Sequence, residues 1–487
     1  MLQWSPLRGW IVFLLNANGK DLIKMQDSMK EPLLGEDDRM RGLLESTTER
    51  ALRYLEGLPS RSVAPTQEAI AALKTLHTPM PDGPMSPESV LQVLDALGSP
   101  ATMAMAGPRF FGFVVGGSLP VALAANWLAG AWDQNSALAN ITPGTALLEQ
   151  IALEWIVDLF GLPACSAGAF VTGATMGNFC GLAAARHAIL AQAGWNVEAN
   201  GLFGAPPITV IAGDEAHPSL TKALGLLGMG RNRVVRVPVD NQGRMRSDAL
   251  GPIAGPTIVC LQAGNVNSGA FDPFLPICER AHEAGAWVHV DGAFGLWAAA
   301  VDGLDELTRG IDQADSWATD AHKWLNVPYD SGLAIVRDPD ALRAAMAISA
   351  EYLPVETELR NPSDFTPEFS RRARGVEIWA ALRSLGRSGL ADQIERTCRH
   401  ARRFAEGLRA AGYSILNDVV LNQVLVSFGE ARTTERVIEE IQADGTLWCG
   451  RTRWQGHTAM RISVSCWRTE ESDVEKSLDA MLRIATK

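Results

Sequence analysis

Apolar residues recur at helical spacing in the first third of the chain. Positions three and four apart are apolar in several stretches, which predicts helices over residues 40–58, 122–132 and 145–161. A proline-rich joint at residues 79–87 and a glycine- and aromatic-rich stretch at residues 107–120 interrupt this pattern. We expect the second of these interruptions to be a surface loop or the lining of a site.

The middle of the chain alternates short strand patterns with helical ones. Runs rich in β-branched residues predict strands over residues 208–212, 234–237, 257–261, 287–290, 316–319 and 333–336. Helical patterns lie between them, over residues 176–193, 219–227 and 275–284. Alternation of this kind predicts an α/β fold with a mainly parallel central sheet covered by helices.

The last third of the chain has the pattern of a smaller α+β region. A strongly helical stretch is followed by two strand patterns and a closing helix, over residues 372–412, 423–428, 460–464 and 469–484. We therefore expect an N-terminal helical segment, a large α/β domain, and a lid segment joined to a small C-terminal α+β domain, with bounds of 1–100, 101–345 and 346–487.

Composition narrows the class of protein. The 487-residue chain is 47% hydrophobic and 20% charged, which is typical of a soluble globular protein, and its formal net charge of -12 argues against nucleic acid as a partner. Its seven cysteines show no paired spacing, so we expect free thiols in the cytoplasm. The apolar stretch at residues 10–17 is too short to cross a bilayer, and we expect neither secretion nor a membrane partner.

Lys323 is the first candidate for chemistry. It lies between His322 and Trp324, just after the strand pattern at residues 316–319. A lysine is ordinarily a solvated surface residue. Bulky neighbours that exclude water would instead favour its neutral amine, which can form a covalent bond with a carbonyl carbon.

Asp291 is the second candidate, because it ends the strand pattern at residues 287–290. Ligands collect at the carboxyl ends of strands in α/β sheets, although such an aspartate can also serve only to form a turn or cap a helix. A lysine nucleophile and a strand-end aspartate are the two groups that a pyridoxal phosphate (PLP) enzyme needs most: the amine binds the cofactor, and the carboxylate holds the pyridine nitrogen protonated. His289 and Asp291 could alternatively form a metal-binding pair in a hydrolase, but the sequence supplies no second cluster at ligand spacing, so we expect no metal.

Three further stretches could complete a cofactor site. The small-residue turn at residues 172–179 leads into a helix and could present backbone N–H groups to a phosphate, although most such turns bind nothing. His217 follows a strand and precedes a helix, where its ring could cap the helix or lie flat over an aromatic cofactor. Tyr352 opens a polar segment with little periodicity, which is a candidate lid.

Six short motifs occur in one order between residues 107 and 470. They are Pro-Arg-Phe-Phe-Gly-Phe (108–113), His-Pro-Ser-Leu-Thr-Lys-Ala (217–223), Gly-Ala-Phe-Asp-Pro (269–273), His-Val-Asp-Gly-Ala-Phe-Gly (289–295), Asp-Ala-His-Lys-Trp (320–324) and Ser-Arg-Arg-Ala-Arg (370–374). Together they resemble the group II PLP-dependent amino acid decarboxylases, the family of aromatic amino acid, glutamate and tyrosine decarboxylases. The resemblance implies the aspartate aminotransferase-like fold of PLP-dependent transferases, known as fold type I, and a homodimer with shared active sites.

The resemblance also implies roles in cofactor binding. Lys323 would bind PLP covalently, Asp291 would pair with the pyridine nitrogen, and the ring would lie between His217 and Ala293. The remaining cofactor contacts would come from residues near the phosphate and the ring, namely Ala174, Thr175, His322 and Asn265.

On the substrate side, the resemblance implies that Tyr352 protonates the substrate carbon after carbon dioxide leaves. Arg461 would lie near the substrate carboxylate, and Phe110 and Trp132 would line the pocket for an amino acid side chain. The chain departs from the family pattern at residues 132–137, which leaves the identity of the substrate open.

We therefore expect decarboxylation of an L-amino acid to its amine, with an aromatic substrate favoured. An acidic substrate, glutamate or aspartate, is the nearest alternative, because Gln134 and Asn135 are similar to polar motifs in glutamate-type relatives. A PLP-dependent aldehyde synthase, an aminotransferase and a carbon–carbon lyase are further alternatives. Tyr352 favours decarboxylation over oxidative deamination, because relatives that form aldehydes often lack that tyrosine.

Overall fold

The computed structural model describes residues 37–348 and 359–487. The chain divides into two compact units, Met1–Ala104 and Met105–Lys487. The bounds expected for three domains, at residues 100 and 345, stay predictions. The proposed lid tyrosine, Tyr352, lies outside the described residues, as does the apolar stretch at residues 10–17.

The described part of the first unit is helical. Its elements are α3 (Asp37–Gly57), α4 (Gln67–Lys74), α5 (Pro87–Val93), the π-helical η2 (Leu94–Gly98) and α6 (Ser99–Ala101). Side chains before two of these helices satisfy their first backbone donors: Thr66 accepts from Ala69 N, and Ser86 accepts from Ser89 N. Several large apolar side chains of this unit are exposed, including Met40, Leu44 and Leu52.

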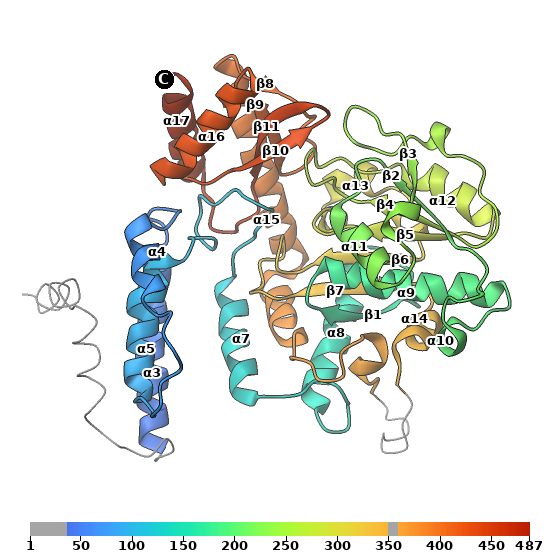
Figure 1. The fold of residues 1–487 in the computed structure, drawn as a ribbon, viewed down its shortest axis with the longest axis horizontal. Helices are drawn as coiled ribbons and strands as arrows, with labels where there is room; N and C mark the ends of the chain where they lie inside the picture. Colours follow the sequence, from blue (N-terminus) through green and yellow to red (C-terminus); the bar gives the residue numbers. More distant parts are fainter. Residues whose placement is uncertain (1–36, 349–358) are drawn as a thin grey trace, which may run out of the picture. The chain divides into compact units, whose positions relative to one another are not determined.

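A seven-stranded sheet forms the centre of the second unit (Figure 1). Its strands are β1 (Ala167–Val171), β2 (Thr209–Gly213), β3 (Val235–Val237), β4 (Thr257–Gln262), β5 (Trp287–Asp291), β6 (Ser316–Asp320) and β7 (Gly332–Val336). They lie in the order β1-β7-β6-β5-β4-β2-β3. The neighbouring pairs β3–β2, β2–β4, β4–β5 and β5–β6 are parallel, whereas β7 is antiparallel to both β1 and β6. The expected mainly parallel sheet is therefore confirmed.

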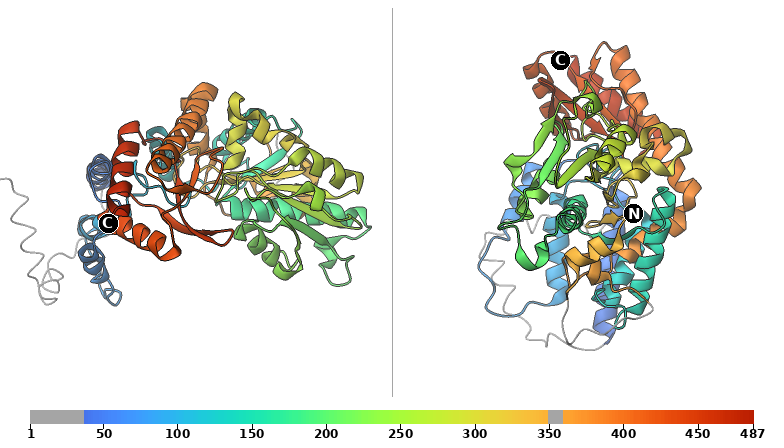
Figure 2. Two further views of the ribbon diagram at one scale, coloured as in Figure 1. Left: turned by 90° about the horizontal axis from the view of Figure 1, so that it is seen from above. Right: turned by 90° about the vertical axis from the view of Figure 1, so that its right-hand side faces the viewer.

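Helices cover both faces of this sheet, as Figure 2 shows from two further sides. One face packs against α9 (Ala174–Gln192), α11 (Pro218–Leu226) and α14 (Pro339–Met346) in a single apolar cluster. The other packs against α8 (Pro143–Leu159), α12 (Phe274–Glu283) and the first half of α15 (Gly375–Ala410). Because successive strand residues face opposite sides, β5 sends Val288 and Val290 to the second cluster and Trp287 to the first.

A four-stranded antiparallel sheet forms a smaller layer near the carboxyl end of the chain (Figure 1). Its strands are β8 (Ser414–Ile415), β9 (Gln423–Ser427), β10 (Gly450–Trp454) and β11 (His457–Ser463), in the order β10-β11-β9-β8. The helices α16 (Ala431–Asp444), α17 (Glu471–Ala485) and the second half of α15 pack with it around one apolar cluster. The helix α15 changes direction at Gly386, whose positive φ of 60° is not helical.

Shorter elements connect these layers. They are α7 (Pro120–Trp132), α10 (Val197–Asn200), η3 (Arg231–Arg233), η4 (Ser247–Ala249), η5 (Gly295–Ala300), η6 (Asp302–Leu304), α13 (Asp305–Thr308), η7 (Ile311–Gln313) and η8 (Pro362–Phe365). Within the described residues, no helix has the length and apolar character needed to cross a bilayer.

Candidate active site

The site lies where β5 and β6 end side by side. Asp291 ends β5 and Asp320 ends β6, and the two strands are parallel neighbours, so both carboxylates reach the same edge of the sheet. Hydrogen bonds continue beyond the strands, from Gly292 N to Ala318 O at 2.8 Å and from Asp320 N to Ala293 O at 2.9 Å. This pairing fixes the backbone that leads to Lys323, three residues after β6.

Lys323 is held by Asp320. Its Nζ lies 2.8 Å from Asp320 Oδ2, and the lysine side chain is 21% exposed whereas that of Asp320 is 4% exposed. The neighbouring Trp324 is fully buried and donates to Thr397, so it anchors the segment. The amine is therefore ion-paired and reachable, and it is not as fully dehydrated as the bulky neighbours indicated.

The amino end of α9 faces the same carboxylate. Ala174 N donates to Asp320 Oδ1 at 2.5 Å, and Thr175 is half-buried in the first helical turn. A Cβ placed on Gly173 would lie 3.2 Å from both Asp320 Oδ1 and His322 Cε1, so a side chain there would crowd these groups. The amino end of a helix beside a lysine suits a phosphate, because the helix dipole favours negative charge there, and a phosphate could accept from Ala174 N in place of Asp320.

His322 points its Nε2 toward this region. Its Nδ1 accepts from Ser331 N at 3.0 Å, which leaves the proton on Nε2, 3.4 Å from Asp320 Oδ1. Tyr329 stacks on the ring with the centroids 4.2 Å apart. Burial lowers the pKa of His322, so the ring is a neutral donor.

Asp291 accepts hydrogen bonds at both oxygens. Asn178 Nδ2 donates to Oδ2 at 2.9 Å, Ser219 Oγ lies 3.3 Å from the same oxygen, and Ala293 N donates to Oδ1 at 3.2 Å. Ser219 also lies 2.7 Å from Nδ1 of His217, which caps α11 by accepting from Ser219 N. Burial is the main cause that lowers the pKa of His217, and it outweighs the opposing effect of Asp291.

His289 does not form a metal-binding pair with Asp291. Its Nδ1 lies 2.8 Å from Ser316 Oγ and its Nε2 lies 2.9 Å from Asn178 Oδ1, so both ring nitrogens are engaged. Groups of three or more metal-ligand side chains are absent from the described residues. The geometry therefore argues against the metal-dependent hydrolase.

Two predicted residues, Asn265 and Arg461, bond to the loop at residues 265–268. Asn265 is 1% exposed, and its side chain accepts from Asn267 N and Ser268 N and donates to Glu215 O, so its polar atoms hold a loop. Arg461 on β11 donates to Val266 O at 3.1 Å, and burial lowers its pKa to about 10. Among the residues that the structure describes, no carboxylate lies within ion-pair distance of Arg461.

The predicted pocket residues Phe110 and Trp132 lie in different surroundings. Phe110 is 3% exposed and stacks on Trp448 at 5.1 Å between centroids. Trp132, at the end of α7, is 46% exposed and lines a cavity of about 390 Å³ with Gln134, Gly144, Thr145 and Leu148. Their shared role in substrate binding stays a prediction.

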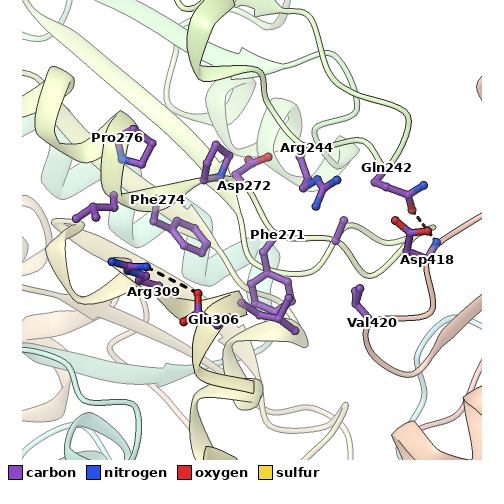
Figure 3. Close-up of a pocket in the computed structure, with 14 residues that line it drawn as sticks. Gln242, Arg244, Phe271, Asp272, Phe274, Pro276, Glu306, Arg309, Asp418 and Val420 are labelled. Atoms are coloured by element: carbon purple, nitrogen blue, oxygen red, sulfur yellow. Dashed lines mark hydrogen bonds and ion pairs between the residues drawn. The ribbon is translucent and has the colours of Figure 1, made fainter. Parts of the chain in front are cut away.

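A larger cavity, of about 450 Å³, lies away from these groups (Figure 3). Figure 3 shows Arg309 near Phe274, the first residue of α12, and Asp418 near Gln242. Its lining includes none of the predicted site residues. The cavity therefore gives no support for an alternative active site.

Three residues of the site were not assigned a role from the sequence. Asp320 belongs to a motif that was recognised, and its place at the end of a strand, like that of Asp291, was the available signal. Asn178 lies four residues after Ala174, so both face the same side of α9. Ser219 also belongs to a recognised motif, residues 217–223, but its contact with Asp291 joins two distant segments and could not be read from that motif.

These groups fit PLP. The lysine amine, the strand-end carboxylate, the half-buried imidazole of His217 and the amino end of α9 could hold the aldehyde, ring nitrogen, ring face and phosphate of that cofactor. The arrangement therefore defines a PLP-dependent enzyme of fold type I.

Comparison with known proteins identifies the family. Residues 72–429 match the pyridoxal-dependent decarboxylase conserved domain, which is more than half of the chain, and the protein belongs to this family of PLP-dependent carboxy-lyases. An aromatic-L-amino-acid decarboxylase of Bacillus atrophaeus is 24% identical over 478 residues, which cover 94% of this chain and 97% of that protein. An acidic amino acid decarboxylase of Mus musculus is 29% identical over 302 residues, which cover 59% and 54%.

A solved structure gives the same fold. The crystal structure of Oryza sativa TDC with PLP and tryptamine aligns with a TM-score of 0.86 at 21% identity, and the alignment covers 94% of this chain and 99% of that one. The resemblance inferred from the six motifs is therefore confirmed, together with the fold class and the cofactor.

Proposed function

We propose that this protein decarboxylates an aromatic L-amino acid to its amine. The observation that carries the proposal is the meeting of Lys323, Asp291, His217 and the α9 terminus at the ends of β5 and β6. The aromatic preference is supported by the near end-to-end match with the bacterial aromatic-L-amino-acid decarboxylase. The match with the acidic amino acid decarboxylase covers only about three-fifths of this chain.

In this proposal Lys323 binds the cofactor covalently, and Asp291 holds a proton at its ring nitrogen. Bound PLP supplies an electron sink for the pair left on the substrate carbon when carbon dioxide departs. His217 and Ala293 would contact the two faces of the ring. The α9 terminus, with Ala174, Thr175 and the Nε2 proton of His322, holds the phosphate, and Asn265 keeps the adjoining loop in place.

An aromatic surface near the lysine supports the aromatic substrate. Phe110 and Phe113 both stack on Trp448, with centroids 5.1 Å and 5.5 Å apart, and Phe113 is 63% exposed. The same loop continues to Gly116, where a Cβ would lie 1.7 Å from Lys323 O, so the loop passes directly against the backbone of Lys323. A planar side chain could stack on such a surface.

Arg461 is the proposed partner of the substrate carboxylate. A half-buried guanidinium loses hydration without compensation when no carboxylate among the described residues pairs with it, and a bound carboxylate would supply that partner. Tyr352 is proposed to protonate the substrate carbon. Arg461 would thus hold the substrate, and Tyr352 would complete the reaction.

Two alternatives remain to be tested with this proposal. An acidic substrate would place a second carboxylate near the site, where the aromatic side chains of the loop offer it no charged partner. An aldehyde synthase would release an aldehyde with ammonia and hydrogen peroxide, after oxygen reacts at the same carbon that Tyr352 would protonate.

We also propose that the protein is a cytoplasmic homodimer. The helix α7 is rich in apolar residues, yet its Val121, Leu128 and Trp132 are exposed, a pattern that suits an interface between subunits. The seven cysteines are free, and six of them are buried, which suits a reducing compartment. Light scattering in solution would test the homodimer, and a single-subunit mass would contradict it.

The decisive experiment for the reaction is a panel of the common amino acids incubated with holoenzyme. Carbon dioxide, amine, aldehyde and peroxide are measured together for each. The proposal expects carbon dioxide and an equal amount of amine from an aromatic amino acid. Lys323→Ala should abolish the release, and Lys476→Ala, a substitution at an exposed lysine of α17, should not. Release of carbon dioxide and amine from acidic amino acids, with none from aromatic ones, would contradict the aromatic assignment.

A further inference from the structure

The polar side chains behind Asp291 form one continuous chain of hydrogen bonds. Because residues two apart on a strand share a face, His289 and Asp291 of β5 both face α9. Asn178 on α9 lies between them, 2.9 Å from His289 Nε2 through its oxygen and 2.9 Å from Asp291 Oδ2 through its nitrogen. Ser316 on β6 continues the chain at the other end, 2.8 Å from His289 Nδ1.

The two ends of this chain fix the direction of its protons. At one end, Trp287 Nε1 can only donate, and it does so to Ser316 Oγ at 2.8 Å, which frees the hydroxyl proton for His289 Nδ1. At the other end, an ionised Asp291 can only accept, so Asn178 must present its N–H₂ to Asp291 and its oxygen to His289. Both requirements place the imidazole proton of a neutral His289 on Nε2.

The surroundings of the chain are dry and tightly packed. Asn178, His289 and Ser316 are all 0% exposed. A Cβ placed on Gly181, one turn after Asn178 on α9, would lie 2.8 Å from both Nδ1 and Cε1 of His289. The ring therefore occupies space that only a glycine leaves open, and its position is set from both the helix and the sheet.

A group so placed can act on the cofactor only through Asp291. The polar atoms of Asn178 and His289 are engaged with each other, with Ser316, with Asp291 and, at 3.4 Å, with Ser219. We propose that His289 and Asn178 are positioning residues that hold the Asp291 carboxylate at the angle at which it receives the N–H of the cofactor ring. This inference rests on the role proposed above for Asp291.

The chemistry of each member explains why these residue types are needed. An asparagine carries a donor and an acceptor on one planar group. It can therefore accept from a ring nitrogen and donate to a carboxylate, which fixes the two groups relative to each other without adding charge. An aspartate at the same position would set two carboxylates within hydrogen-bond distance, and one of them would have to hold a proton. A leucine would leave Asp291 and His289 each without a buried partner.

The direction of the protons can be tested without cofactor. Nitrogen NMR of histidine-labelled, cofactor-free protein, with the His289 signals assigned by their loss in His289→Gln, should show a neutral ring with the proton on Nε2. Burial lowers the pKa of His289 to about 4, so this form should persist at mildly acidic pH. A proton on Nδ1 would overturn the chain as drawn.

The positioning role is tested by the affinity for PLP and by the pH dependence of the bound cofactor's visible spectrum. Asn178→Leu and His289→Leu should each raise the Kd for PLP roughly tenfold or more. The first removes the hydrogen bond to the Asp291 carboxylate, and the second removes the partner that orients the Asn178 amide. His289→Gln, whose amide can still donate to Asn178, should recover most of the affinity. Spectra and affinities like those of the unaltered protein in both leucine variants would overturn the proposal.

Matched controls separate positioning from general damage. Asn422→Leu removes another fully buried asparagine, which donates to Val464 O and Ser465 Oγ and accepts from Gln423 Nε2. Gly181→Ala displaces the His289 ring while removing no polar group, and Gly389→Ala, a helix position with only ordinary contacts, is its control. If Asn178→Leu fails to fold, Gly181→Ala and His289→Gln decide, since the proposal requires the first to weaken PLP binding and the second to retain it.

Failure of this inference can be distinguished from failure of the proposed function. Lys323→Ala and Asp291→Asn are measured in parallel. If neither alters the cofactor spectrum, the proposed roles of Lys323 and Asp291 are wrong. If both alter it and the Asn178 and His289 variants do not, only the positioning role is wrong.

Discussion

The buried histidine His289 should make the protein sensitive to acid. Burial lowers its pKa from the ordinary 6.5 to about 4, against a smaller opposing effect of Asp291. Above the ordinary value His289 is neutral in both folded and unfolded chains. As the pH falls below 6.5, the unfolded chain binds a proton at His289 and the folded chain does not. The free energy of unfolding therefore decreases between pH 6.5 and about pH 4.

The size of this loss follows from the two pKa values. At about 1.4 kcal/mol per pH unit, the interval from 6.5 to about 4 corresponds to a loss of about 3 kcal/mol in the free energy of unfolding. About 2 kcal/mol of it should be lost between about pH 7.5 and about pH 5. His289→Gln cannot gain this proton, so its stability should fall less over the same range.

Urea unfolding of cofactor-free protein at both pH values measures this difference. The unaltered protein should lose about 2 kcal/mol more than His289→Gln, whereas His457→Gln, at an exposed position on β11, should behave as the unaltered protein does. A difference below about 0.5 kcal/mol would refute the assignment of His289 as a neutral, buried ring.

Three other substitutions test separate parts of the account. Asp320→Asn removes a carboxylate that faces Ala174 N and would repel the phosphate of PLP. PLP titrations followed by fluorescence should therefore show tighter binding, up to roughly tenfold, and weaker binding would show that Asp320 aids phosphate binding. Tyr352→Phe should shift the product from amine toward aldehyde, and unchanged amine with no aldehyde would remove the tyrosine from the mechanism. Because the hydrogen bond to Asp315 raises the pKa of His282, His282→Asn should lower the urea midpoint near pH 6 and have little effect once the pH exceeds that raised value; an equal effect at both would contradict this sign.

Much of the sheet could be predicted because its strands are buried on both faces. β4, β5 and β7 each hold at least two β-branched residues, and their expected ranges, like that of β6, agree with the structure to within one residue at each end. β1 was missed, because its sequence Ala-Gly-Ala-Phe-Val begins with three small residues that are uncommon in strands. Its partner β7 supplies the context that makes it a strand.

Elements of the smaller sheet and its helices were harder to predict from the sequence. The strand β10, Gly-Arg-Thr-Arg-Trp, is half exposed and carries two arginines, so it lacks a buried strand's pattern, and it is set by pairing with β11. The helix α16 was missed as well, although its polar face is regular and its apolar face packs in the core. Pairing between segments decides a strand such as β10, and local sequence does not record it, whereas the helical periodicity of α16 is present in the local sequence.

The site divides in the same way. Lys323 and Asp291 could be found because each follows a strand in a recognisable motif. The hydrogen bond from Asn178 to Asp291 joins residues 113 positions apart, and the one from Asn178 to His289 joins residues 111 apart. A single sequence gives no measure of such distant contacts, so the support behind the carboxylate became visible only in the fold.

The central claim is that Lys323 binds the cofactor. Borohydride reduction of the holoprotein, followed by proteolysis and mass spectrometry, fixes the cofactor to whichever lysine holds it. The account predicts the added mass on the peptide that contains Lys323 and its absence after Lys323→Ala. Cofactor mass on a different lysine of the unaltered protein would contradict the account.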